Sequence, residues 1–170
     1  MKTFYCLLPL LTAHCAAALS LEITPRGTGT CTTAAFETGS RLFANRDYTL
    51  AEPPAALKGM TFLRAPIEGV KLRCTVPGEV VALTPPDVPR ATSIASALLA
   101  QGFSKDADTP TFQLFGTNAH ECVAVYRKNL TTGETLKLGK WCVVLGLAQA
   151  TVNSVVKKPW PENAGEQLYN

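Results

Sequence analysis

A short run late in the chain holds the side chains best suited to acid–base chemistry. His120, Glu121 and Arg127 could bring an imidazole, a carboxylate and a guanidinium to one strand. Because side chains alternate along a strand, Glu121 and Arg127 share a face while His120 points to the other. We therefore expect a histidine at a loop edge and two exposed charges, with no catalytic residues. If a hydrolytic carboxylate pair exists, Glu121 and Glu134 are its first candidates.

Other side chains suggest binding rather than catalysis. Asn129-Leu130-Thr131 satisfies the N-glycosylation pattern in a predicted exposed turn, which makes Asn129 a candidate glycosylation site. Tyr126, Trp141 and Trp160 are candidate binding aromatics, because an exposed ring offers an apolar face to a ligand. For Trp141 the alternative is core packing beside the neighbouring cysteine. No serine lies in a GxSxG elbow.

The first 18 residues have the features of a secretion signal. Lys2 supplies the positive start, residues 4–12 form an apolar run, and Ala16-Ala17-Ala18 offers a cleavage site, with cleavage after Ser20 as the alternative. The apolar run is too short to span a bilayer, and no later run reaches about 18 apolar residues. We therefore expect a secreted, extracellular protein with no membrane span.

The cysteines that follow this leader predict two disulfides. They are Cys31, Cys74, Cys122 and Cys142. Four is an even number, and an exported chain meets an oxidising environment. If Cys122 and Cys142 lie two strands apart, roughly 9–10 Å separates them, beyond disulfide reach. We therefore expect each to pair with Cys31 or Cys74. The wide spacings, with one histidine left, argue against zinc, and we expect no metal and no cofactor.

Residues 121–147 predict a three-stranded antiparallel meander. Residues 122–126 are β-branched and aromatic, and residues 135–138 alternate between apolar and polar. Residues 141–147 are nearly all apolar and predict a central strand covered on both faces. Residues 129–133 carry turn chemistry, with Gly133 free to adopt a positive φ.

One helix is well signalled between Asp87 and Gly102. Asp87 suits the N-cap, Pro89 suits the first turn, and Gly102 lies where a C′ glycine belongs. Residues 91, 94, 95 and 98 recur at helical spacing and form one apolar face. Further strands are expected over residues 21–24, 60–64, 70–76, 112–115 and 152–156.

These elements predict an α+β fold, with one helix packed on a curved antiparallel β-sheet and stapled by disulfides. We expect a signal peptide over residues 1–18, an N-terminal extension with short strands and loops over 19–69, an α+β core over 70–158, and a C-terminal tail over 159–170. Removing Lys2 from the 16 basic residues and setting the rest against 13 acidic residues leaves a charge of +2. RNA is a conceivable partner, but this charge does not support it.

Four features of the sequence occur in the same order as in a known protein family. They are Leu72-Arg73-Cys74, the single helix, residues 109–112, and the strand that begins at Trp141. Over residues 70–157 this order resembles small secreted proteins of ribonuclease fold, which include ribotoxins and the RNase-like effectors of fungal plant pathogens. The family's Tyr-x-Cys near the mature N-terminus is not reproduced here.

The resemblance implies the catalytically inactive branch of that family. Its active members cleave RNA with a base, an acid and an arginine, a set that usually includes two histidines and a glutamate. Leu145-Gly146-Leu147 stands where the family places a catalytic histidine. After the leader only His120 remains, so the two-histidine chemistry cannot be assembled.

Three functions follow as alternatives. The first is a secreted, non-enzymatic, effector-like protein that binds a host or extracellular protein partner, as a pseudo-ribonuclease. The second is an extracellular inhibitor or a carbohydrate-binding module that uses exposed aromatics. The third is a secreted hydrolase acting on RNA or polysaccharide. The export signal and the missing catalytic set favour the first.

Overall fold

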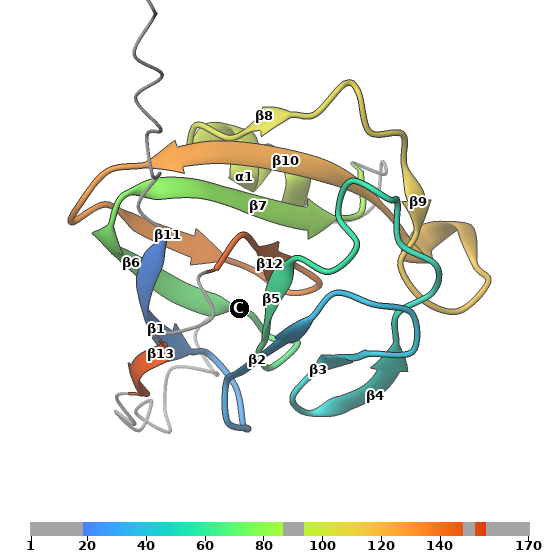
Figure 1. Cartoon of the computed structure of the whole chain (residues 1–170), viewed down its shortest axis with the longest axis horizontal. Coiled ribbons are helices and arrows are strands. Elements are labelled where there is room, and N and C mark those ends of the chain that lie inside the picture. The colour runs from blue at the N-terminus through green and yellow to red at the C-terminus, as the bar shows by residue number, and fades with distance from the viewer. Residues whose placement is uncertain (1–18, 87–93, 148–151, 156–170) are drawn as a thin grey trace, which may run out of the picture.

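Two β-sheets lie face to face in the computed structural model, which describes residues 19–86, 94–147 and 152–155 (Figure 1). The larger sheet has seven strands in the order β2-β5-β12-β7-β10-β8, with β9 beside β10, and the smaller has four in the order β11-β6-β1-β13. A separate hairpin pairs β3 with β4. The strands are β1 (Ser20–Pro25), β2 (Thr32–Ala35), β3 (Arg41–Phe43), β4 (Arg46–Thr49), β5 (Thr61–Arg64), β6 (Val70–Val76), β7 (Gly78–Thr84), β8 (Ser104–Lys105), β9 (Phe112–Gln113), β10 (Cys122–Leu130), β11 (Thr135–Leu138), β12 (Val143–Leu145) and β13 (Val152–Val155).

The expected α+β fold is wrong, because a second sheet does the covering that was assigned to a helix. In the described residues the helical elements are α1 (Ile94–Ala100) and the 3-10 helix η1 (Ala119–Glu121). Seven residues are about 10 Å of helix, too short to cover a sheet of this width. The helix does end as expected: Gly102 has a φ of 82°, and the Phe103 amide donates to the Leu98 carbonyl.

The expected disulfides are also wrong, since all four described cysteines are free thiols. Cys31 and Cys142 directly precede β2 and β12, which lie on the two sides of β5. Cys122 starts β10, which is separated from β12 by β7. Strands two places apart are about 9–10 Å apart, beyond the reach of a disulfide. Cys74 belongs to β6 in the other sheet.

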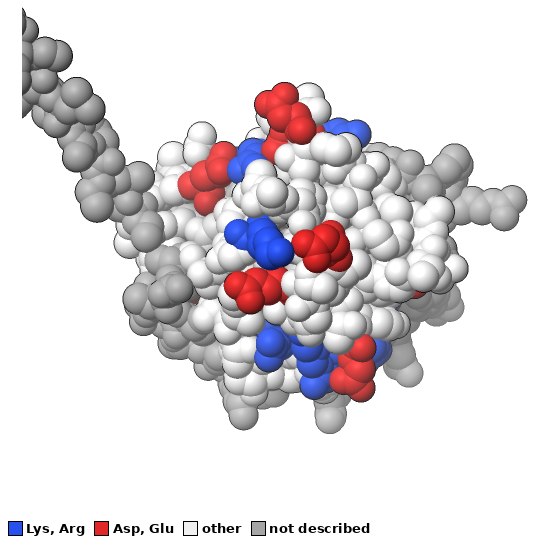
Figure 2. All heavy atoms as spheres, turned by 45° about the vertical axis from the view of Figure 1, so that its right-hand side comes forward, with Lys and Arg blue, Asp and Glu red and all other residues white. Residues whose placement is uncertain are grey.

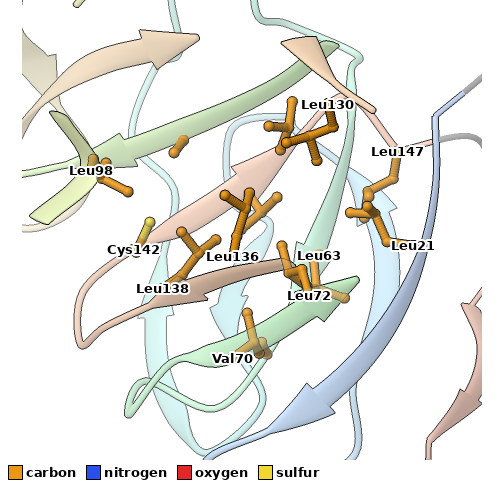
Figure 3. Packing of buried hydrophobic residues seen from close by; sticks show 14 of the residues in the cluster. Leu21, Leu63, Val70, Leu72, Leu98, Leu130, Leu136, Leu138, Cys142 and Leu147 are labelled. Carbon is orange, nitrogen blue, oxygen red and sulfur yellow. The ribbon is translucent and has the colours of Figure 1, made fainter. Parts of the chain in front are cut away.

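A first core fills the space between the two sheets. Leu72 of β6 and Leu136 and Leu138 of β11 point towards Leu63 of β5 (Figure 3). All four side chains are buried. The α1 helix adds Leu98 at one side of this core. The smaller sheet therefore has one buried face, and its other face meets solvent.

A second core covers the opposite face of the larger sheet. Leu42 and Phe43 of β3 pack there with Phe62 of β5 and with Val81 and Leu83 of β7. The β3–β4 hairpin is thus a third layer over part of the larger sheet, at the lower right of Figure 1. The central strands of that sheet are buried on both faces.

The expected meander does not form, although its three strands do. β11 pairs with β6 in the smaller sheet, while β10 and β12 lie on the two sides of β7. The residue patterns explain the separation: β10 and β12 are apolar on both faces, whereas β11 alternates between buried and exposed positions. A strand with two apolar faces is stable only inside a covered sheet, and an alternating strand suits a sheet with one wet face.

Residues 19–69 contribute to both sheets. β1 lies between β6 and β13, and β5 lies between β2 and β12. β13 spans Val152–Val155, close to the expected strand, and pairs with β1 in parallel. The predicted signal peptide over residues 1–18 and the tail over 159–170 lie outside the described residues. Within the described ranges, no helix is long and apolar enough to cross a membrane.

Candidate functional site

Four aromatic side chains gather where the β3–β4 hairpin meets the loop before β12. The ring of Trp141 stacks at 5.7 Å on the rings of both Tyr48 and Phe115, which stack on each other at 4.6 Å. Phe43 meets Tyr48 and Trp141 edge-on, at 6.3 and 6.2 Å. Phe43 and Phe115 are buried, whereas Tyr48 and Trp141 are half-buried. We call these four residues the Trp141 cluster, and its solvent side consists of Tyr48 and Trp141.

The backbone of Trp141 is strained. Its φ is 62°, and it is the one non-glycine residue with a positive φ among those described. This left-handed conformation costs an ordinary residue about 1–2 kcal/mol. Such strain persists only where the surroundings impose it, and it is concentrated at functional sites. Here the Trp141 amide donates to the Ile67 carbonyl at 3.2 Å, and the three neighbouring rings fix the side chain.

A polar rim lies beside the Trp141 cluster and is formed by Asn45, Arg46 and Glu68. The Ile67 amide donates to Asn45 Oδ1 at 3.0 Å, so Ile67 joins the rim to the backbone of Trp141. Asn45 Nδ2 donates to Glu68 Oε2 at 2.8 Å. Arg46 NH2 lies 3.9 Å from Glu68 Oε1. Hydrogen-bonding groups therefore border an apolar aromatic surface, the usual composition of a small-molecule site.

The candidate residues from the sequence have different positions. Trp141 belongs to the cluster just described. Tyr126 is 3 % exposed and lies in the first core, so its ring is not available to a ligand. Asn129 is exposed and lies opposite Glu79 near the end of β10, in the strand and not in the expected turn. Trp160 lies outside the described residues.

The candidate carboxylates of a hydrolytic pair do not meet. Glu121 and Glu134 lie beyond opposite ends of β10, roughly 30 Å apart at the usual rise of a strand. A glycosidase pair needs about 5–10 Å. Glu121 accepts the Asn118 amide at 2.8 Å. Glu134 lies 2.5 Å from Lys128 Nζ, and a hydrogen bond from that ammonium lowers the pKa of Glu134.

The grouping of Glu121 with Arg127, which the sequence offered but which we did not expect to be catalytic, does not form, because Arg127 is engaged elsewhere. Arg127 Nε lies 2.7 Å from Asp106 Oδ2, and NH1 lies 2.9 Å from Glu79 Oε2. The hydrogen bond from Arg127 lowers the pKa of Asp106 and in turn raises the pKa of Arg127. An aspartate with a lowered pKa stays ionised and is unsuited to act as a general acid. Sequence reasoning missed this bridge, since residues 79 and 106 are far from 127 in the chain.

Beside this ion bridge is a shallow hollow of about 480 Å³ over the loop from Lys105 to Thr111. Asp106 lines the hollow, but its carboxylate already accepts the amides of Asp108 and Thr109 and the hydroxyl of Thr109. Hydrogen bonds within the protein therefore occupy its main polar group. The hollow therefore offers a ligand little free hydrogen-bonding capacity from Asp106.

The two packed sheets define a β-sandwich. Among the comparisons with known proteins, only the search of solved structures found matches. No family model and no curated protein matches the sequence. This chain is similar to part of a β-glucuronidase of glycoside hydrolase family 2, at 13 % identity and a TM-score of 0.50. The match covers 72 % of this chain and 14 % of the enzyme. The chain is also similar to part of a family 138 glycoside hydrolase targeting the pectin rhamnogalacturonan II, at 19 % identity and a TM-score of 0.51. This match covers 80 % of this chain and 17 % of the enzyme.

These matches show a shared fold and no more. The chain corresponds to less than a fifth of the length of either enzyme. A fold shared with part of an enzyme carries no catalytic residues by itself. The resemblance to RNase-like effectors stays a prediction, as does the binding of a protein partner.

Proposed function

We propose that this chain is a secreted, non-catalytic carbohydrate-binding protein that holds a sugar against the half-buried rings of Trp141 and Tyr48. The observation that carries the proposal is the Trp141 cluster. It combines two half-buried aromatic rings, a strained backbone held in place and a polar rim. A pyranose ring has an apolar C–H face that suits an aromatic surface, and hydroxyls at its edge that suit a polar rim.

The hydrolase, effector and inhibitor roles gain less support from the described residues. A hydrolase would need an acid and a base close together, whereas Glu121 and Glu134 are far apart and Asp106 is bridged to Arg127. The effector and inhibitor roles rest on two features of the sequence, the predicted export signal and the missing catalytic set. The fold shared with parts of two enzymes that act on glycans supports the carbohydrate ligand class.

Affinity electrophoresis of the purified protein in gels containing single soluble polysaccharides tests this proposal. At least one polysaccharide should retard the parent protein. Trp141→Gly should abolish the retardation, because it removes the ring and can still adopt the native φ. Tyr48→Phe keeps the ring and should keep the binding.

Leu99→Ala is the matched control, since Leu99 is exposed on α1 and lies outside the Trp141 cluster. It should leave the retardation unchanged. If no polysaccharide retards the parent, or if Trp141→Gly binds like the parent, the proposal is wrong.

A further inference from the structure

Arg46 is the cationic side chain best placed to act on a ligand at the Trp141 cluster. It starts β4, two residues before Tyr48, and lies directly opposite Phe43 in the hairpin. The register of the hairpin shifts between the Arg41–Thr49 and Phe43–Arg46 pairs, so simple alternation does not fix the face of Tyr48 relative to Arg46. Directly opposed side chains share a face, which places Arg46 on the side of Phe43. The Cα atoms of Arg46 and Tyr48 are about 7 Å apart at the usual rise. Arg46 therefore lies next to the cluster residues Phe43 and Tyr48 in the hairpin.

Most of the hydrogen-bonding capacity of Arg46 is unused. A guanidinium has five N–H donors, and Arg46 donates from NH1 to the Asn45 carbonyl at 2.7 Å. Its separation from Glu68, 3.9 Å, is too long for a hydrogen bond. Glu68 instead accepts from Asn45. With 48 % of its side chain exposed, Arg46 can bind a further anion.

Two more arginines make this corner of the molecule basic. Arg64 Nε donates to the Arg41 carbonyl, and Arg41 Nε donates to the Arg46 carbonyl, both at 3.0 Å. Arg41 pairs with Asp47 at 3.1 Å, whereas Arg64 has no ion pair within the part of the chain that the structure describes. Figure 2 shows basic side chains gathered at the lower end of one face, with acidic atoms beside them. Set against Asp47 and Glu68, the three arginines leave a small local excess of positive charge.

We propose that the site prefers an acidic sugar, a uronate, whose carboxylate is bound by Arg46 while its ring stacks on Trp141 and Tyr48. This inference rests on the proposed carbohydrate-binding function and adds the class of sugar. The planar fork of a guanidinium matches a carboxylate with two parallel hydrogen bonds, which a neutral sugar cannot form. A uronate carries its carboxylate one bond outside the ring, which fits a cation at the border of a stacking surface.

Isothermal titration of the purified protein with polygalacturonate and with its fully methyl-esterified form tests the inference. The two polymers share a backbone and differ in charge. The parent should bind the acid form roughly ten- to a hundredfold more tightly, the ratio expected for a hydrogen-bonded charge pair. Arg46→Gln should remove this preference, and Arg46→Lys should restore only part of it because an ammonium lacks the fork.

Arg73→Gln is the matched control. Arg73 is exposed in β6, on the smaller sheet, and pairs with Glu22 there. It should keep the parent's preference. An equal loss in Arg73→Gln and Arg46→Gln would indicate unspecific attraction to a polyanion and would overturn the inference.

Two other results separate this inference from the proposed function. If both polymers bind equally and Trp141→Gly abolishes both, the uronate preference is wrong while carbohydrate binding stands. If neither polymer binds and a neutral glycan does so through Trp141, the uronate preference is again wrong. Failure of every glycan to bind would overturn both proposals.

Discussion

Replacing Trp141 with glycine should cost less stability than replacing it with alanine, the reverse of the usual order. At ordinary positions alanine is better than glycine by roughly 0.5–1 kcal/mol, because glycine loses more backbone freedom on folding. At a φ of 62° alanine carries a steric penalty that glycine does not. We therefore expect Trp141→Gly to be the more stable variant by about 1 kcal/mol.

Both variants should be less stable than the parent, because both lose the ring. Trp141 makes three aromatic contacts, with Phe43, Tyr48 and Phe115. At about 0.5–1.5 kcal/mol for each pair, their loss amounts to roughly 3 kcal/mol. Trp141→Ala should lose about that much, and Trp141→Gly about 2 kcal/mol after the strain is relieved.

Urea denaturation followed by far-UV circular dichroism measures both differences. In a chain of this length, 1 kcal/mol also shifts the melting temperature by about 2–4 °C, which gives an independent reading. A Trp141→Ala variant as stable as Trp141→Gly, or more stable, would refute the reasoning. Residue 141 would then not be held in the left-handed region, and the step from strain to a functional site would fail.

Two further predictions concern Asp106 and the thiols. The hydrogen bond from Arg127 lowers the pKa of Asp106 in the folded protein below its value in the unfolded chain. The ionised carboxylate therefore stabilises the folded state above the unfolded pKa, and this stabilisation disappears as pH falls through the folded pKa. Asp106→Asn should therefore be less stable than the parent at pH 7, with a smaller gap at pH 3; a constant gap in urea melts would contradict this. For the cysteines after residue 18, alkylation and mass mapping should find four free thiols in the unfolded protein. In the native protein half-buried Cys122 should react first, because burial raises the pKa of Cys31 to about 11 and of Cys142 to about 12. A protected pair in the unfolded protein would contradict the free-thiol assignment.

Local residue patterns predicted many elements correctly. Residues 70–76 and 135–138 were expected as strands and form β6 and β11 with those bounds. The apolar run after Trp141 was expected as a central strand, and all three residues of β12 are buried. Gly102 ends α1 as its position indicated. Each of these predictions depends on side-chain periodicity or on the backbone freedom of one residue, which neighbours in the chain determine.

The largest omission was β7 (Gly78–Thr84), the strand between β10 and β12. A signal was present, because Val80, Val81, Ala82 and Leu83 form a continuous apolar run after Pro77-Gly78. Such a run indicates a strand buried on both faces. Because β7 was not predicted, β10, β11 and β12 were expected to pair with one another in a meander. A single sheet covered by one helix was then enough to bury the predicted apolar faces.

The candidate site was predictable only in part. Trp141 was recognised as an exposed or core aromatic, but its partners Phe43, Tyr48 and Phe115 come from segments far from it in the sequence. Arg46 had no distinguishing feature, because an arginine in a charged stretch is ordinary. Its proximity to the rings depends on the pairing of β3 with β4 and on the packing of that hairpin over the larger sheet.

By itself the sequence determined which segments form strands and how many of their faces are apolar, since both follow from the order of side chains along a few residues. Only the tertiary structure decided which strands pair, whether the cysteines meet, and which aromatics pack together. Those outcomes depend on burying every apolar face at once, so each strand's place is set by segments distant in the chain. The second sheet and the Trp141 cluster are both products of that long-range packing.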